Sequence, residues 1–114
     1  MDYDQGPFEL FQGVWRTKNI NTGKITSVAE YSNDKPHGHY LFFSASGGIT
    51  QSLYYYHGVL NGPLLEFWEN GSLQTVGYYS SGKLEGLLKS FDSTGSLINV
   101  AGYTNGSREG PEIR

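Results

Sequence analysis

Glycine recurs along this chain of 114 residues at a constant interval of 24. Three glycine-rich columns share the interval: Gly23, Gly47, Gly71 and Gly95; Asp34, Gly58, Gly82 and Gly106; and Gly38, Gly62, Gly86 and Gly110. Chance can place one such column in a glycine-rich chain, but three interleaved columns with one period indicate a tandem repeat. The sequence therefore predicts four copies of one structural unit, each packed against the next.

Apolar and aromatic residues repeat between the glycines with the same period. Three of these columns are Ile25, Ile49, Leu73 and Leu97; Tyr31, Tyr55, Tyr79 and Tyr103; and Phe43, Phe67 and Phe91. The expected turns lie alternately 11 and 13 residues apart, which leaves segments of about eight residues. Such segments suit β-strands and are too short for most packed helices. Each unit is therefore predicted to be a β-hairpin.

The turn residues indicate how each hairpin closes. Asn70-Gly71 is the clearest turn, because both residues tolerate the positive φ that a tight hairpin turn requires. Weaker versions of the same chemistry are Thr22-Gly23, Ser46-Gly47, Thr94-Gly95, Asn61-Gly62 and Asn105-Gly106. One strand column is mostly small: Ala29, Leu53, Gly77 and Ala101. We expect a backbone or a neighbouring ring to approach closely there, so that the sheet curves.

These patterns predict an all-β fold, in which tandem β-hairpin repeats of period 24 form a curved, single-layer antiparallel meander sheet. The expected parts of this single domain, 1–114, are an N-terminal cap (1–12), four repeats (13–37, 38–61, 62–85, 86–109) and a tail (110–114). Gly13 and Trp15 lie one residue out of register, which predicts a bulge in the first strand. Pro111 is expected to blunt the last sheet edge.

Composition and missing motifs exclude several functions. The chain has no cysteine, which excludes a disulfide-stabilised scaffold and a metal site with thiolate ligands. Its net charge of -3 and scattered cations argue against a nucleic-acid partner. No nucleophile elbow, phosphate loop or zinc-protease motif occurs, so we expect a protein that is not an enzyme and needs no cofactor. Without an apolar span or a signal-peptide pattern, a cytoplasmic location is expected.

Paired aromatic residues are the main binding candidates. Neighbouring rings in a strand point to opposite faces, so one ring of each pair can be core while the other is free to contact a partner. The residues favoured for a protein interface are Tyr40, Phe42, Tyr54, Tyr56, Trp68 and Tyr78. The alternative is that curvature and long polar side chains cover both faces.

Carboxylates and histidines allow further interpretations. Glu66, Glu69 and Glu85 can be ordinary solvated charges at strand ends and turns, or part of an acidic rim that steers a basic partner. The three imidazole rings of His37, His39 and His57 are enough to coordinate a zinc ion. However, His37 and His57 lie in or next to the second expected turn of a repeat, where polar residues are ordinary, so no metal site is assigned.

Residues 62–86 contain Gly-Pro-Leu-Leu-Glu-Phe-Trp-Glu-Asn-Gly and end in Gly82-Lys83-Leu84-Glu85-Gly86, which resembles the MORN repeat. The similarity is to the variant found in bacterial antitoxin and immunity-type proteins, and it covers about residues 13 to 110. Lys18, Asp34, Leu64 and Leu88 depart from the usual pattern.

The resemblance implies a meander of hairpins and a protein-binding role, most specifically an antitoxin or immunity protein that occludes a toxin or effector. Two alternatives remain open. One is a scaffold that binds membrane surfaces or lipid headgroups, and the other is carbohydrate binding on exposed aromatic rings. The identity of the partner, the oligomeric state and the binding face are not predicted.

Overall fold

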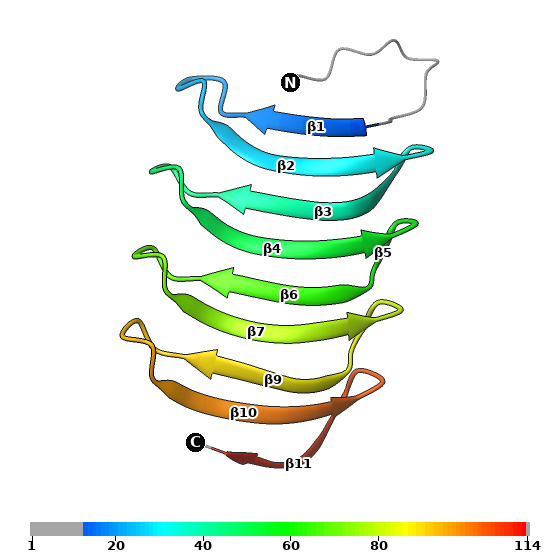
Figure 1. Cartoon of the computed structure of the whole chain (residues 1–114), viewed down its shortest axis with the longest axis vertical. Helices are drawn as coiled ribbons and strands as arrows, with labels where there is room; N and C mark the ends of the chain where they lie inside the picture. Colours follow the sequence, from blue (N-terminus) through cyan, green and yellow to red (C-terminus); the bar gives the residue numbers. More distant parts are fainter. Residues whose placement is uncertain (1–12, 114) are drawn as a thin grey trace.

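The computed structural model describes residues 13–113, and the side chains of residues 13–108. This part of the chain contains no helix and forms one antiparallel sheet of 11 strands (Figure 1). The strands are β1 (Gly13–Lys18), β2 (Ile25–Ser32), β3 (Lys35–Phe43), β4 (Ile49–Tyr56), β5 (Val59–Leu60), β6 (Gly62–Phe67), β7 (Leu73–Ser80), β8 (Lys83–Leu84), β9 (Gly86–Phe91), β10 (Leu97–Thr104) and β11 (Ser107–Ile113). The predicted all-β meander is confirmed, and the predicted cap over 1–12 lies outside the described residues.

Each strand pairs with its sequence neighbours, in the order β1-β2-β3-β4-β6-β7-β9-β10-β11. The short β5 pairs with β4, and β8 with β7, so that β5–β6 and β8–β9 are each one strand interrupted by a single residue, Asn61 or Glu85. Every described strand belongs to this one sheet, so none of them forms a second layer. Burial must therefore come from side chains on the sheet itself. The last strand, β11, pairs with β10 alone and continues to Ile113, through much of the predicted tail.

Two kinds of connection alternate along the sheet, and their chemistry differs from the prediction. Positive φ at both central residues occurs in the two-residue turns Asn33-Asp34, His57-Gly58, Ser81-Gly82 and Asn105-Gly106. These are the type I′ turns that match the twist of the strands.

The predicted turn at Asn70-Gly71 is present, but the expected positive φ at both residues is wrong. Only Gly71 has positive φ, at 91°, and its amide bonds to the Trp68 carbonyl at 2.9 Å. The loop between β6 and β7 spans residues 68–72, and this longer path needs only one left-handed residue. Asn61-Gly62 is not a turn at all, because it lies inside the β5–β6 strand.

The extra residue of the first repeat lies in its loop. The β1–β2 loop covers residues 19–24, six residues, whereas the β3–β4 loop covers 44–48, five residues. The Gly23 amide therefore donates to the carbonyl of Asn19, four residues earlier in the chain. In the β3–β4 loop, the Gly47 amide donates to the carbonyl of Ser44, only three residues earlier. Strand β1 does have a register shift, between Thr17 and Lys18, but similar shifts occur at the loop ends of later hairpins. A bulge in the first strand thus does not account for the insertion.

The core is a row of side chains across one face, which we call the inner face. Its buried apolar members are Trp15, Ala29, Leu64 and Ala101. The register links Trp15 to Ala29 and Leu64 to Gly77, so the row runs across the strands. A Cβ at Gly77 would lie 2.7 Å from Leu88 Cδ1, closer than packed carbon atoms allow. A close approach does occur at this small column, but the aliphatic side chain of Leu88 makes it and not the expected backbone or ring.

Candidate protein-binding face

The predicted aromatic residues do not share one face of the sheet. Tyr40 lies on the inner face, because it pairs with Ala29 and Leu53. Its ring stacks on Phe42 with centroids 5.0 Å apart and an interplanar angle of 16°. Both rings are half-buried, and Tyr40 also contacts Tyr55 at 5.7 Å. Tyr40 and Phe42 are thus part of the packed inner face.

Burial affects the chemistry of the inner face as well. Burial raises the pKa of Tyr55 above its ordinary value, and the neighbouring Tyr40 and Tyr79 raise the same pKa further. The Tyr55 hydroxyl therefore stays neutral at physiological pH.

Tyr54, Tyr56 and Tyr78 lie on the opposite side, which we call the outer face. His39 pairs with Tyr54, one residue beyond the Tyr40–Leu53 pair, so both side chains point away from the core. The His39 and Tyr54 rings meet edge to face at 5.0 Å. Tyr54 also covers the backbone at Gly62, where an added Cβ would lie 3.0 Å from the Tyr54 Cβ. This half-buried ring anchors the outer face.

Large apolar side chains on the outer face are exposed. Tyr56 is 55% exposed, Tyr78 49% and Leu87 55%. Val14 and Val59, which pair with Glu30 and Tyr56, belong to the same face and are exposed too. Several exposed large apolar side chains on one face of a sheet are a typical feature of an interaction surface.

Sequence reasoning missed Leu87 and Val59. Leu87 precedes Leu88, whose side chain packs over Gly77 on the inner face, so strict alternation places Leu87 on the outer face. The pair Leu87-Leu88 therefore indicates, from sequence alone, that one of the two leucines lies on each face. Val59 gave no comparable signal, because it lies in a strand of only two residues.

Trp68 and Glu69 lie in the β6–β7 loop, at the end of the strands rather than on either face. The Trp68 indole Nε1 donates to the Phe91 carbonyl at 3.0 Å, which ties this loop to the next repeat. Asn70 adds a second link, because its Nδ2 donates to the Ser93 carbonyl at 2.9 Å. The ring of Trp68 therefore has a structural contact, while Glu69 is exposed.

Glu66 and Glu85 are separated as well. Glu66 pairs with Thr75 on the inner face, and its Oε2 accepts a hydrogen bond of 2.8 Å from Gln51 Nε2. Glu85 interrupts β8–β9 near the two-residue turns, at the opposite end of the strands from Glu69, and its Oε1 accepts from the Asn105 amide at 2.8 Å. The three predicted carboxylates thus belong to different surfaces and do not form one rim.

The histidines pack against aromatic rings and each other. The rings of His37 and His57 lie 4.6 Å apart, and His37 Nδ1 accepts a hydrogen bond of 3.0 Å from the His57 amide. His37 also contacts the Tyr56 ring at 5.1 Å. Within residues 13–108, no three His, Cys, Asp or Glu side chains are placed to hold a metal ion.

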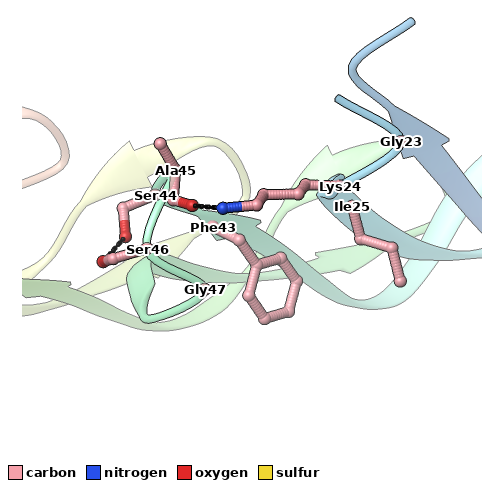
Figure 2. Close-up of a pocket in the computed structure, with 8 residues that line it drawn as sticks. All are labelled: Gly23, Lys24, Ile25, Phe43, Ser44, Ala45, Ser46 and Gly47. Carbon is pink, nitrogen blue, oxygen red and sulfur yellow. Dashed lines mark hydrogen bonds between the residues drawn. The ribbon is translucent and has the colours of Figure 1, made fainter. Parts of the chain in front are cut away.

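A depression of about 470 Å³ lies between the first two loops (Figure 2). Its lining residues are Gly23, Lys24, Ile25, Phe43, Ser44, Ala45, Ser46 and Gly47. Lys24 Nζ donates to the Ala45 carbonyl at 3.0 Å, and the hydroxyls of Ser44 and Ser46 lie 2.8 Å apart. These polar groups bond to each other across the rim, so the depression offers mainly the apolar side chains of Ile25 and Phe43.

A second depression, of about 360 Å³, is lined by Tyr56, His57, Val59, Asn61 and Ser81. Tyr56 and Val59 are outer-face residues, so this hollow extends the exposed apolar surface to the turns. The described residues include no helix with the length and apolar character needed to cross a membrane. No protein-family model, no curated protein and no solved structure matches this chain.

Proposed function

We propose that this protein is a binding module that covers a partner protein with its outer face. The observation that carries the proposal is the exposure of Tyr56, Tyr78 and Leu87 on a sheet over which the described residues form no second layer. Domains ordinarily bury the apolar face of a sheet against another layer. Here a partner takes the place of that layer.

The outer face has the composition of an interface. Tyrosine gives a large contact area at a low entropic cost, and it is enriched among residues that dominate binding energy. The half-buried Leu65 and Val76, which pair with each other between the exposed residues, supply a continuous apolar floor. A rigid ladder of strands holds these side chains in place before binding, which reduces the entropic cost of association.

The more specific proposal rests on the resemblance to MORN-repeat antitoxin and immunity-type proteins. On this proposal the protein acts in the cytoplasm, has no enzymatic activity of its own and neutralises a toxin or effector by occlusion. Side chains from successive repeats would cover the partner's active site or block its assembly. The repeat supports this mode, because it places side chains of successive hairpins side by side on one face.

Coexpression with the product of the neighbouring gene tests the proposal. We expect the two proteins to copurify and the toxic effect of that product to disappear. Leu87→Ser should weaken the complex by about tenfold or more, since loss of a central interface anchor commonly costs about 2 kcal/mol.

Leu97→Ser is the matched control. Leu97 is 52% exposed, close to the 55% of Leu87, but it lies at the loop end of β10. Its substitution should leave the complex unchanged. A chain that neither copurifies with that product nor protects against it would contradict the proposed function.

A further inference from the structure

We propose that the free edge of β11 binds an extended segment of another protein, which adds to the sheet as an antiparallel strand and places a tyrosine opposite Gly110. The free edge is the side of β11 that faces away from β10. Within residues 13–113, β11 pairs with β10 and with no other strand (Figure 1). An unpaired strand edge presents backbone donors and acceptors that a further strand can use. This edge is a second binding site, separate from the outer face.

The proline of β11 does not close this edge. Pro63 has the equivalent position in β6, two repeats earlier, and it pairs with Tyr78 of β7. The Tyr78 carbonyl accepts a hydrogen bond of 2.9 Å from the Glu85 amide, on the other side of β7. Pro63 and Tyr78 therefore form a pair without backbone hydrogen bonds, in which the missing amide hydrogen of proline costs nothing. Pro111 leaves β11 open to a further strand in the same way.

The residues on either side of the proline supply the hydrogen bonds. Backbone groups alternate in direction along a strand, so Gly62 and Leu64 are the residues of β6 that turn their amides and carbonyls to β7. The residues at these positions in β11 are Gly110 and Glu112. Each of them therefore turns an amide and a carbonyl to the free edge, where an added strand can bond to them.

The glycine at this position has the same partner in all four repeats. It pairs with a tyrosine of the following strand: Gly13 with Tyr31, Gly38 with Tyr55, Gly62 with Tyr79, and Gly86 with Tyr103. Glycine has no side chain, so it leaves room on the inner face for the ring directly opposite. Gly110 continues this column, and the described residues pair no tyrosine with it. A strand that adds to the free edge can supply the missing tyrosine.

The residue two places before the tyrosine is limited as well. In three of the four repeats this residue is small: Ala29, Gly77 and Ala101. Its partner across the strands is large in each case: Trp15, Leu64 and Leu88. The corresponding residue of β11, Glu112, is also long. An extended segment with a small residue, any residue and a tyrosine in succession therefore fits the free edge.

A second folded copy of this chain does not supply such a segment. The strands that contain the four tyrosines, β2, β4, β7 and β10, are each paired on both sides. The strands at the two ends of the described sheet are β1 and β11, and neither contains a tyrosine. The occupant that fits the free edge is therefore an extended segment of a different protein.

A synthetic peptide tests the proposal without knowledge of the natural partner. Its sequence is that of residues 96–105, which contain β10 with one flanking residue on each side. Fluorescence anisotropy of the labelled peptide with the full chain should show saturable binding. The same peptide with Tyr103→Ser should bind about tenfold or more weakly, because it lacks the ring opposite Gly110. Amide hydrogen exchange, followed by NMR, should become slower at Gly110 and Glu112 when the peptide is added.

A substitution at the free edge locates the peptide. Glu112→Pro removes an amide hydrogen that faces the free edge, while Ile113, which pairs with Val100 of β10, keeps its own. The affinity for the peptide should fall about tenfold or more. Glu112→Ala is the matched control, because it keeps the amide, and its affinity should stay within about twofold of the unchanged chain. Near-ultraviolet circular dichroism of the buried Trp15 checks the fold of both variants.

Several results would overturn the proposal. One is unchanged exchange at Gly110 and Glu112 with the peptide at about 1 mM, and another is equal affinity for the Tyr103→Ser peptide. Peptide binding that is lost in Leu87→Ser but kept in Glu112→Pro would place the peptide on the outer face. Exchange at the two amides that slows with rising protein concentration, without peptide, would identify a second copy as the occupant. The proposed function of the outer face is tested separately, by the coexpression experiment.

Discussion

The side-chain oxygen of Asn61 accepts a hydrogen bond of 2.9 Å from the backbone amide of Ser81. The equivalent residues one repeat away make the same bond, from His57 to His37 Nδ1 at 3.0 Å and from Asn105 to Glu85 Oε1 at 2.8 Å. Asn61 and Glu85 each interrupt a strand, whereas His37 lies within β3, and in each case the donor is the first residue of the next two-residue turn. Three chemically different side chains thus perform one task, because each offers an acceptor at the same place.

Replacing Asn61 with Ala removes this acceptor from the Ser81 amide. The free energy of unfolding should fall by about 1 kcal/mol, the usual net value of one hydrogen bond. Urea denaturation measures the change. Asn61→Asp keeps an oxygen at the same position and should lose much less, and equal losses in the two variants would contradict the role of the bond.

Gly82→Ala should destabilise the protein by about 1 kcal/mol, because φ at this position is 86° and a Cβ disfavours that conformation. Gly48→Ala is the matched control. Gly48 lies in a loop and does not have positive φ, and the nearest atom to an added Cβ there is Ser44 Oγ at 3.8 Å. Thermal unfolding should separate the two variants by several degrees, and identical midpoints would argue against the type I′ turn.

Gly77→Ala should reduce stability by about 1 to 3 kcal/mol, because the added methyl group meets Leu88 Cδ1 at 2.7 Å. Leu88→Ala alone should also destabilise, since it removes a packed side chain. In the double variant the methyl group has room, so the combined loss should be smaller than the sum of the single losses. Additive losses in urea denaturation would contradict the contact.

The raised pKa of Tyr55 predicts a loss of stability at high pH. Because burial holds the folded-state pKa above the unfolded value, the stabilising contribution is complete below about pH 10 and disappears as pH rises through the folded pKa. Ultraviolet titration should show a phenol that ionises late and is absent in Tyr55→Phe. Tyr40→Phe should lower the Tyr55 pKa by removing one neighbouring phenolate, and an unchanged late titration would be evidence against that coupling.

The strands follow from the sequence because side-chain alternation and turn spacing are local properties. Ile49–Tyr56, Leu73–Ser80 and Leu97–Thr104 begin 24 residues apart, as the columns predict. The backbone conformation of the turns does not follow from residue types alone, because Asn70-Gly71 has ideal residues for a two-residue turn but lies in a longer loop. Loop length outweighs residue preference there.

The binding face depends on register, which the sequence did not define. Tyr40 and Tyr54 belong to adjacent strands, and a slip of one residue between the strands would place them on the same face. The observed pairing of Tyr40 with Leu53 places them on opposite sides. Long-range bonds such as Glu85 to Asn105 are equally invisible in sequence, so a carboxylate expected at an interface instead joins two repeats.

Hydroxyl-radical footprinting of the complex with the neighbouring gene's product tests the binding face most directly. Tyr78 and Leu87 are about half exposed in the free protein, as is Leu97 at the loop end. We predict strong protection of Tyr78 and Leu87 in the complex and unchanged oxidation of Leu97. Protection of Leu97 with undiminished oxidation of Tyr78 and Leu87 would contradict the assignment of the outer face as the binding surface.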